Sequence, residues 1–190
     1  MKERLTLTDE DYARQRRIII KTFKALDHFS KPIIAAVNGA AVGGGLIFAL
    51  HSDIIYMADT AKLSMAEVRL GLVGGTVNLP RMIGKHIAKE LLFTGRTITA
   101  QEAFDYGIIN KVVPKEELMD TVKSLALEIT NNAPFAVRQA KKLLNAGPEV
   151  DIDTAFLLEA ECYNVAYYQE DRKEGLKAFN EKRKPEYKNR

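Results

Sequence analysis

The sequence predicts an α/β fold, with a small layer of strands in its first part and a helical second half. Residues 33–37 form an apolar run that Pro32 opens and Asn38-Gly39 ends, which is typical of a buried strand. Beyond residue 80, apolar residues recur mostly at helical spacing. Hydrophobic residues make up 46% and charged residues 28% of the 190 residues, so the chain can bury a core of ordinary size.

Local signals predict the elements of the first part. A helix is expected over residues 9–28, because Thr8 can cap it and three acidic residues follow in its first turn. The other elements expected here are a strand over 33–37, a short helix from Gly43 to about His51, strands over 53–59 and 61–65, and a turn over 71–75. Two or three strands form a thin sheet, so this layer is expected to lack partner strands.

The second half is expected to be helical with one lone strand. Thr99 and Glu102 have the spacing of a capping box, and Gly107 suits the end of the short helix that they begin. The other elements expected here are a strand over 109–113 and helices over 115–131, 134–145, 151–167 and 169–182.

Composition excludes some classes of protein. The formal net charge of +3 is too small to indicate a nucleic-acid partner, although it suits an anionic small molecule. Cys162 is the single cysteine, so no disulfide can form within the chain and a reducing compartment is expected. The apolar runs are interrupted well short of the roughly 20 residues that a membrane-spanning helix needs.

Three consecutive glycines, Gly43–Gly45, lead into an apolar run of helical length, although glycine costs about 1 kcal/mol per residue in a helix. A dinucleotide-binding fingerprint fits poorly, because Gly39 is separated from these glycines by three residues. A phosphate-binding loop also fits poorly, because IGKH (residues 83–86) lacks the hydroxyl residue. Two explanations remain open. The glycines allow close packing of a helix on a strand, or they let a substrate oxygen reach free N–H groups at the helix start.

The segment KPIIAAVNGAAVGGGLIFALHSDIIYMADTAKLSMAEVRLGL resembles the central segment of the crotonase superfamily, the enoyl-CoA hydratase/isomerase family. LLFTGRTITAQEAFDYGIINKVVP and the C-terminal DRKEGLKAFNEKRKPEY match the same family. The resemblance implies a crotonase-like spiral of ββα units followed by a helical trimerisation region. Residues 1–114 would form a partial core and residues 115–190 the helical oligomerisation region. It also implies that the first strands, and one donor of the oxyanion site, lie upstream of residue 1.

The resemblance implies acyl-coenzyme A thioesters as substrates and fatty acid metabolism as the setting. Coenzyme A would be part of the substrate, so no separate cofactor and no metal are expected. The expected partners are copies of the same chain, in a trimer or a hexamer, and neither a membrane nor nucleic acid is expected. The expected location is the cytoplasm, or the mitochondrial matrix if the true N-terminus lies further upstream.

The resemblance also assigns residues to the thioester site. Gly44 would donate its N–H to the thioester oxygen, with Gly43 beside it in the substrate site. Phe179 would lie against the adenine and Lys182 would meet a phosphate, both reaching the coenzyme A of a neighbouring subunit. Lys2 would touch the same cofactor within its own subunit.

Hydratases of this family use two glutamates, because water addition moves protons at two positions. Ile47 occupies the first position, one helical turn after the glycines, and cannot transfer a proton. Glu67 occupies the second, among apolar neighbours that suit a proton shuttle. One carboxylate favours double-bond isomerisation, whereas the overall resemblance favours hydration. A non-catalytic thioester-binding or assembly subunit is the alternative. The segment GLVGGTVNLP (residues 71–80) is also shorter than the loop that borders the family's acyl pocket.

The other polar candidates give weaker signals. The histidines, His28, His51 and His86, lack metal-ligand spacing. Cys162 is expected to pack as a small hydrophobe, and Asp53 to cap or orient backbone. The basic tail EKRKPEYKNR has three open interpretations, which are a solvated end, a nucleic-acid patch and a phosphate contact.

Overall fold

The computed structural model describes residues 6–190, and Lys2, which was predicted to contact the substrate, lies outside the described residues. The helices in this part are α1 (Asp9–Asp27), α2 (Gly44–Leu50), α3 (Asn78–Ile83), α4 (Lys85–Thr94), α5 (Ala100–Asp105), α6 (Leu118–Thr130), α7 (Pro134–Ala146), α8 (Ile152–Tyr167) and α9 (Glu170–Asn180). The strands are β1 (Ile34–Val37), β2 (Ala41–Val42), β3 (Ile54–Ala58), β4 (Lys62–Ser64), β5 (Thr97–Thr99) and β6 (Lys111–Val113). Short 3-10 turns lie at η2 (Glu67–Leu70), η3 (Lys115–Glu117) and η4 (Gly147–Glu149).

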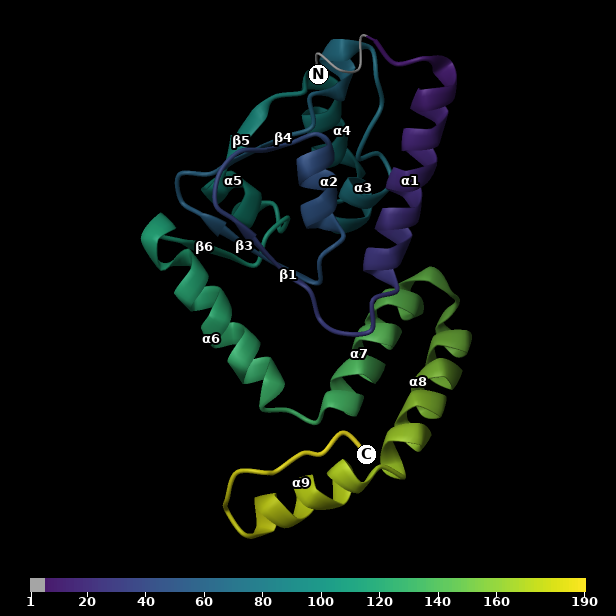
Figure 1. The fold of residues 1–190 in the computed structure, drawn as a ribbon, viewed down its shortest axis with the longest axis vertical. Coiled ribbons are helices and arrows are strands. Elements are labelled where there is room, and N and C mark those ends of the chain that lie inside the picture. Colours follow the sequence, from purple (N-terminus) through teal and green to yellow (C-terminus); the bar gives the residue numbers. More distant parts are fainter. Residues whose placement is uncertain (1–5) are drawn as a thin grey trace.

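Two small sheets form the strand layer (Figure 1). The first sheet has the order β1-β3-β6 and is parallel, with Ile34 opposite Ile54 and Tyr56 opposite Lys111. The second has the order β2-β4-β5, in which β2 and β4 run parallel and β4 and β5 antiparallel. The predicted strands near 33–37, 53–59, 61–65 and 109–113 are present, whereas β2 and β5 were not predicted.

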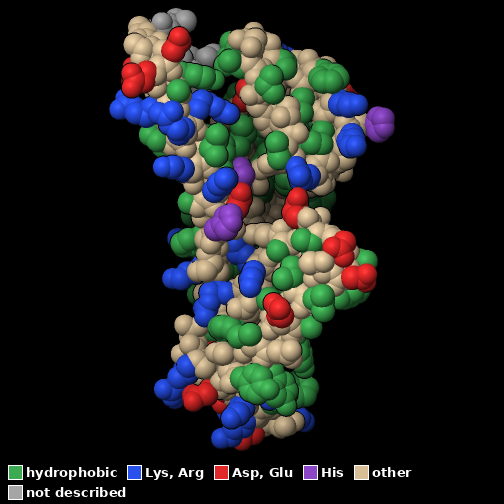
Figure 2. All heavy atoms as spheres, turned by 90° about the vertical axis from the view of Figure 1, so that its right-hand side faces the viewer, with side chains coloured by type: hydrophobic (Ala, Val, Ile, Leu, Met, Phe, Trp, Pro, Cys, Tyr) green, Lys and Arg blue, Asp and Glu red, His purple; other side chains and the backbone are tan. Residues whose placement is uncertain are grey.

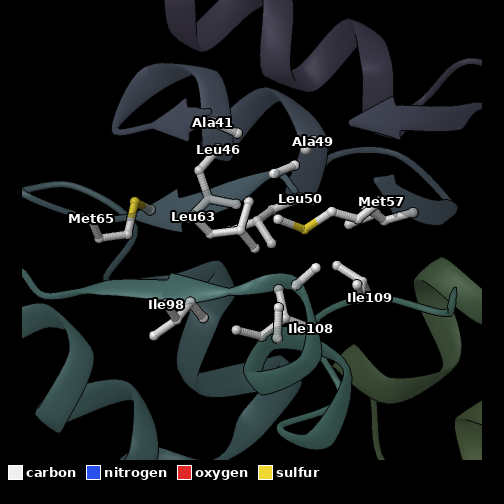
Figure 3. Close-up of a cluster of buried hydrophobic side chains, with 14 of the residues drawn as sticks. Ala41, Leu46, Ala49, Leu50, Met57, Leu63, Met65, Ile98, Ile108 and Ile109 are labelled. Atoms are coloured by element: carbon white, nitrogen blue, oxygen red, sulfur yellow. The ribbon is translucent and has the colours of Figure 1, made fainter. Parts of the chain in front are cut away.

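The core lies between α2, the strands and the helices α3–α5. Figure 3 shows side chains from α2, β3, β4 and β5 pointing toward one another in this layer. The largest fully buried side chains are Met57, Leu63, Leu79 and Leu118. Burying a side chain of this size contributes about 1.5–3 kcal/mol, so these positions fix how the helices sit on the strands.

The predicted helix starts are confirmed by their caps. The Thr8 side chain accepts the Asp11 N–H at the start of α1. At the start of α5, Thr99 and Glu102 form the predicted capping box, and Gly107 follows the helix in a left-handed conformation, with φ of 76°.

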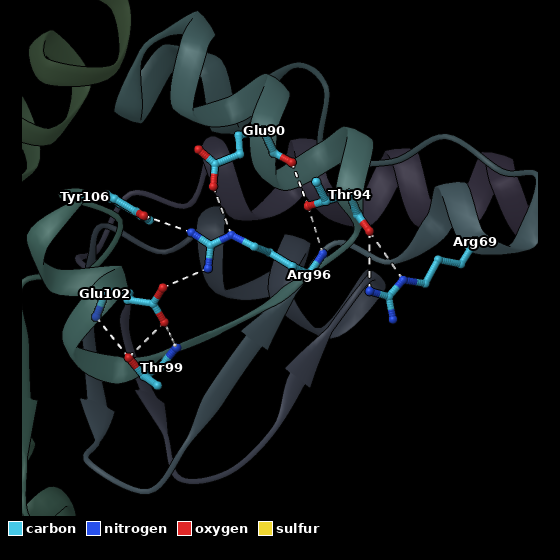
Figure 4. Close-up of polar contacts among 7 residues, drawn as sticks. All are labelled: Arg69, Glu90, Thr94, Arg96, Thr99, Glu102 and Tyr106. Atoms are coloured by element: carbon cyan, nitrogen blue, oxygen red, sulfur yellow. Dashed lines mark hydrogen bonds and ion pairs between the residues drawn. The ribbon is translucent and has the colours of Figure 1, made fainter.

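A polar network joins α4 and α5 (Figure 4). The Arg96 guanidinium donates to Glu90, to Glu102 and to the Tyr106 hydroxyl at 2.7–3.1 Å. The pKa of Glu102 is lowered, first by the Thr99 N–H and then by Arg96. This network lies at the start of β5, the strand that pairs antiparallel with β4. The strand β4 leads in turn toward the candidate site.

The helix α6 packs against β1 and β3, and α7–α9 extend away from the strand layer (Figure 1). An ion pair joins them to it, because Lys141 on α7 donates to Asp53 Oδ2 at 2.7 Å and to the Lys31 carbonyl at 3.0 Å. Asp53 Oδ2 also accepts the Ile33 N–H at 2.6 Å, which confirms that Asp53 orients backbone. No helix among residues 6–190 is long and apolar enough to cross a membrane.

Two details of the helical half differ from expectation. The turn η3 precedes α6, so that helix begins at Leu118 rather than at residue 115. The helix α9 ends at Asn180 rather than at residue 182, because Lys182 has a φ of 52° and cannot continue a right-handed helix. Lys182 therefore lies in a turn and does not share a helix face with Phe179.

Candidate active site

The two short strands β2 and β4 bring the glycine run and Glu67 together. Val42 lies opposite Ser64 in the parallel register, and the Gly43 N–H donates to the Ser64 carbonyl at 2.8 Å. The strand β2 therefore leads into α2 beside the point where β4 leads toward η2. The pairing of two segments about 20 residues apart in sequence is what creates the site.

Gly43 occupies a conformation that only glycine adopts readily, with φ of 53° and ψ of −118°. The helix α2 begins at the next residue, so the Gly44 N–H has no acceptor within the helix. Gly44 and Gly45 are both exposed, and a Cβ atom built on either would meet nothing within 4 Å. Both glycines therefore leave open space beside the backbone N–H groups of the helix start, which supports the second explanation of the glycine run.

The Glu67 carboxyl lies against two glycines. A Cβ atom on Gly43 would come within 2.7 Å of Glu67 Oε1, and one on Gly74 within 2.8 Å of the same oxygen. Glycine at both positions is therefore what makes room for the carboxyl. Gly74 was predicted only as part of a turn, because nothing local in GLVGG indicates which distant side chain the turn approaches.

One oxygen of this carboxyl has no partner. Among the described residues, Glu67 Oε2 is a buried side-chain oxygen without a hydrogen-bond partner. An unpartnered buried carboxylate oxygen is costly, and such groups are found where chemistry requires them. This oxygen therefore makes no structural hydrogen bond.

Contacts with α4 fix the backbone around Glu67. The Leu72 N–H donates to the Glu67 carbonyl at 3.0 Å and closes the turn η2. Arg69 contacts the Thr94 carbonyl at 3.4 Å through two nitrogens, as Figure 4 shows. The buried Ser64 hydroxyl donates to the Gly95 carbonyl at 3.2 Å. The end of α4 thus holds both sides of the turn that carries the carboxyl.

Ile47 has a core role. It is partly buried and packs against the hydrophobic core, and its N–H donates to the Gly43 carbonyl at 3.0 Å. Glu67 is therefore the carboxylate that the described residues place at the glycine run. Exposed apolar side chains occur in the segments that adjoin it, and these are Val42, Val68, Leu70, Val73 and Val77.

The remaining predicted candidates do not join this site. Phe179 is 82% exposed and Lys182 is also exposed, and Figure 1 places α9 at the opposite end of the molecule from α2. His51 is bound to Asp27 at 2.6 Å and stacks on Phe23, so it joins α1 to α2.

Metal ligands do not gather anywhere in the described part of the chain, where three or more histidine, cysteine or acidic side chains never come together suitably. Cys162 is buried on α8, as expected of a packed hydrophobe.

A family model described as enoyl-CoA hydratase/isomerase matches residues 1–190. The chain belongs to the enoyl-CoA hydratase/isomerase family. It is 45% identical over 174 residues to a short-chain-enoyl-CoA hydratase of Clostridium acetobutylicum, covering 90% of this chain and 67% of that protein. It is 44% identical over 170 residues to a crotonyl-CoA hydratase of Syntrophomonas wolfei, covering 88% of this chain and 65% of that protein.

Among solved structures, the chain is similar to an enoyl-CoA hydratase from Bacillus anthracis. The TM-score is 0.98 at 39% identity, and the match covers 100% of this chain and 75% of the other. This likeness confirms the predicted crotonase fold. The chain spans about two thirds of the length of the Clostridium and Syntrophomonas relatives, so what whole proteins of the family do is a proposal for this chain.

Proposed function

We propose that the protein acts on an acyl-coenzyme A thioester, with Glu67 as the acid/base and the Gly44 N–H as a donor to the thioester oxygen. The observation that carries this proposal is the buried, unpartnered oxygen of the Glu67 carboxyl beside the open helix start at Gly43–Gly45. The names of the relatives, which include short-chain-enoyl-CoA and crotonyl-CoA hydratases, support the substrate class. Coenzyme A enters as part of the substrate, and the mechanism uses no separate cofactor.

In the proposed reaction the Glu67 carboxylate removes a proton from the carbon next to the thioester. The electron pair of that bond moves onto the thioester oxygen, which becomes an enolate oxygen and accepts the Gly44 N–H. A preorganised donor in this position stabilises the developing charge, an effect worth about 3–4 kcal/mol for one such donor. The protonated Glu67 then returns the proton to the γ-carbon, so that a β,γ double bond becomes an α,β double bond.

Hydration is the second candidate reaction, and the relatives' names favour it. Addition of water across the double bond needs one group to activate water and one to protonate the α-carbon. With Ile47 in place of a second carboxylate, Glu67 would carry out both transfers in turn. A thioester-binding subunit without catalytic activity is the third candidate, which the apolar Ile47 favours.

Two substrates separate these reactions. We expect the protein to convert a 3-enoyl-coenzyme A into its 2-enoyl isomer, followed by the appearance of the conjugated double bond. We expect slower conversion of crotonyl-coenzyme A into its 3-hydroxy product. Faster hydration than isomerisation would favour the second candidate, and binding of both thioesters without turnover would favour the third.

We propose further that the active form is a trimer or a dimer of trimers. Many apolar side chains of α8 and α9 are exposed, and Figure 2 shows hydrophobic side chains gathered at the end of the molecule where these helices lie. The exposed residues include Phe156, Leu157, Tyr163, Val165, Tyr167, Leu176 and Phe179. Contiguous exposed apolar surface is typical of an interface between chains.

The position of α9 supports the same assembly. Figure 1 shows α9 far from α2 of the same chain, so Phe179 on α9 and Lys182 after it would contact the coenzyme A bound at the α2 of a second copy. Light scattering should give a mass that is a multiple of three chains, and a monomer would contradict this proposal. The proposed location is the cytoplasm, because several relatives are bacterial proteins, and the name of an Arabidopsis relative suggests a mitochondrial location as the alternative.

A further inference from the structure

The segment that follows α9 folds back along this helix, as the yellow trace in Figure 1 shows. Asp171, which is 3% exposed, accepts the Lys188 N–H at 2.7 Å and the Asn189 N–H at 2.8 Å. The Asp171 N–H in turn donates to the Arg190 carbonyl at 3.0 Å. The far end of residues 181–190 is thereby fixed to the start of α9.

A second set of contacts fixes the near end of the same segment. The Arg183 guanidinium binds both oxygens of Glu174, at 2.6 and 3.0 Å, and donates to Glu181 at 2.7 Å. Glu174 also accepts the Glu186 N–H at 2.8 Å. The pKa of Glu174 is lowered to about 2, first by the Arg183 hydrogen bonds and then by the Glu186 N–H. A bidentate arginine–carboxylate pair has one geometry, so Arg183 has a defined orientation.

Lys182 lies inside this closed turn. Its φ of 52° is a left-handed conformation that L-residues other than glycine rarely adopt. Its N–H donates to the Phe179 carbonyl at 3.2 Å, and the Arg183 N–H donates to the Ala178 carbonyl at 3.0 Å. Unfavourable backbone conformations persist where the surrounding contacts determine them. Here those contacts are the two backbone hydrogen bonds to the end of α9 and the Arg183 side-chain contacts with Glu174 and Glu181.

The carboxylates of Glu174 and Glu181 are both bound by Arg183. The Lys182 ammonium has no ion pair within residues 6–190, although Glu181 is its neighbour in sequence and Glu174 binds the residue that follows it. Arg183 occupies both carboxylates. Besides Arg183, the cation that acts on the Glu174 carboxylate is Lys177.

We propose that Arg183, bound to Glu174 and Glu181, is a positioning residue for the coenzyme A contact of Lys182. Arg183 holds the turn in which Lys182 is presented, through its side-chain contacts with Glu174 and Glu181. This inference rests on the proposed function, since it assumes that Lys182 meets a phosphate of coenzyme A.

Binding measurements on the full assembled chain test the inference. Coenzyme A and adenosine 3′,5′-bisphosphate, which carries the adenine, the ribose and two phosphates without the pantetheine arm, are titrated into the wild type, Lys182→Ala, Arg183→Gln and the double variant. We expect Lys182→Ala to raise the dissociation constant about 5- to 30-fold, the effect of one charge-assisted contact. Arg183→Gln should raise it about 3- to 10-fold, with KM raised and kcat unchanged. In the Lys182→Ala background, Arg183→Gln should have less than about a twofold effect, because the two changes act through one contact.

The control is Arg190→Gln, which also removes one arginine and one ion pair, that with Glu170, and should leave both affinities unchanged. Arg183→Lys keeps the charge without the bidentate geometry and should lie between the wild type and Arg183→Gln. If Arg183→Gln does not fold, Glu181→Gln removes one of the two partners and should give a smaller effect of the same kind.

Three results would overturn the inference. Equal effects of Arg183→Gln with and without Lys182 would show that Arg183 acts independently of it. Loss of the trimer mass in Arg183→Gln would assign Arg183 to assembly. An unchanged affinity in Lys182→Ala would refute the Lys182 contact itself, which is a failure of the proposed function rather than of Arg183 alone.

Discussion

Replacing Gly74 by alanine should reduce activity strongly while leaving stability almost unchanged. The added Cβ atom would lie 2.8 Å from Glu67 Oε1, 2.9 Å from its Cδ and 3.0 Å from its Cγ. Ordinary van der Waals contact begins at 3.4 Å, so the carboxyl must retreat by about 0.6 Å. The atoms that must move belong to the free end of a flexible side chain, and this costs little folding free energy.

The activity should suffer because proton transfer depends on position. A displacement of about 1 Å at a reacting group can cost about 100-fold in rate, so a shift of this size should cost about 10- to 100-fold. The unfolding free energy should change by less than about 1 kcal/mol, which for a chain of this length is a melting temperature shift of no more than about 4 °C.

The assay follows isomerisation of a 3-enoyl-coenzyme A together with thermal unfolding. Gly39→Ala is the matched control, because a Cβ atom on Gly39 meets nothing within 4 Å and this residue lies outside the site. It should retain the wild-type rate. A Gly74→Ala variant with a rate within threefold of the wild type would refute the position that we give to the Glu67 carboxyl.

Three further perturbations test other parts of the molecule. Ile47→Glu places a carboxylate one turn after Gly43, and it should raise the hydration rate of crotonyl-coenzyme A; an unchanged rate in a folded variant would count against this position facing the substrate. Lys141→Met leaves Asp53 without its cation and should lower the unfolding free energy by about 3 kcal/mol in denaturant titration, whereas a loss below about 0.5 kcal/mol would show that this partly exposed pair contributes little. The folded-state pKa of Glu174 is about 2, below its ordinary value of 4.5, so its contribution to stability is complete above pH 4.5 and is lost as the pH falls toward 2. The Glu174→Gln variant should therefore lose less stability than the wild type over that interval, and parallel pH profiles would contradict this linkage.

The sequence was informative where a local signal decides the structure. The Thr8 cap, the capping box at Thr99 and the apolar strand β1 each depend on neighbouring residues, and each is confirmed. The glycine run and Glu67 could be selected because the family resemblance placed them in one motif. Their proximity then follows from the pairing of β2 with β4.

Contacts between distant residues could not be predicted in this way. Gly74 faces Glu67 through the path of a turn, and no periodicity reports that path. The Asp53–Lys141 pair joins residues 88 apart in sequence, so neither carries a local sign of the other. The end of α9 was misplaced by two residues because Lys182 is an ordinary helix former, and the tertiary contacts of Arg183 override that preference.

The most direct test of the Glu67 mechanism is exchange of the α-proton of a saturated acyl-coenzyme A in deuterated water, followed by mass spectrometry. A saturated acyl chain has no double bond to move or hydrate, so exchange reports only the proton transfer at the α-carbon. We predict that the wild type incorporates deuterium and that Glu67→Gln, with the same fold and thioester affinity, does so at least 100-fold more slowly. Exchange in Glu67→Gln within threefold of the wild-type rate, or no exchange in the wild type, would contradict the assignment of Glu67 as the acid/base.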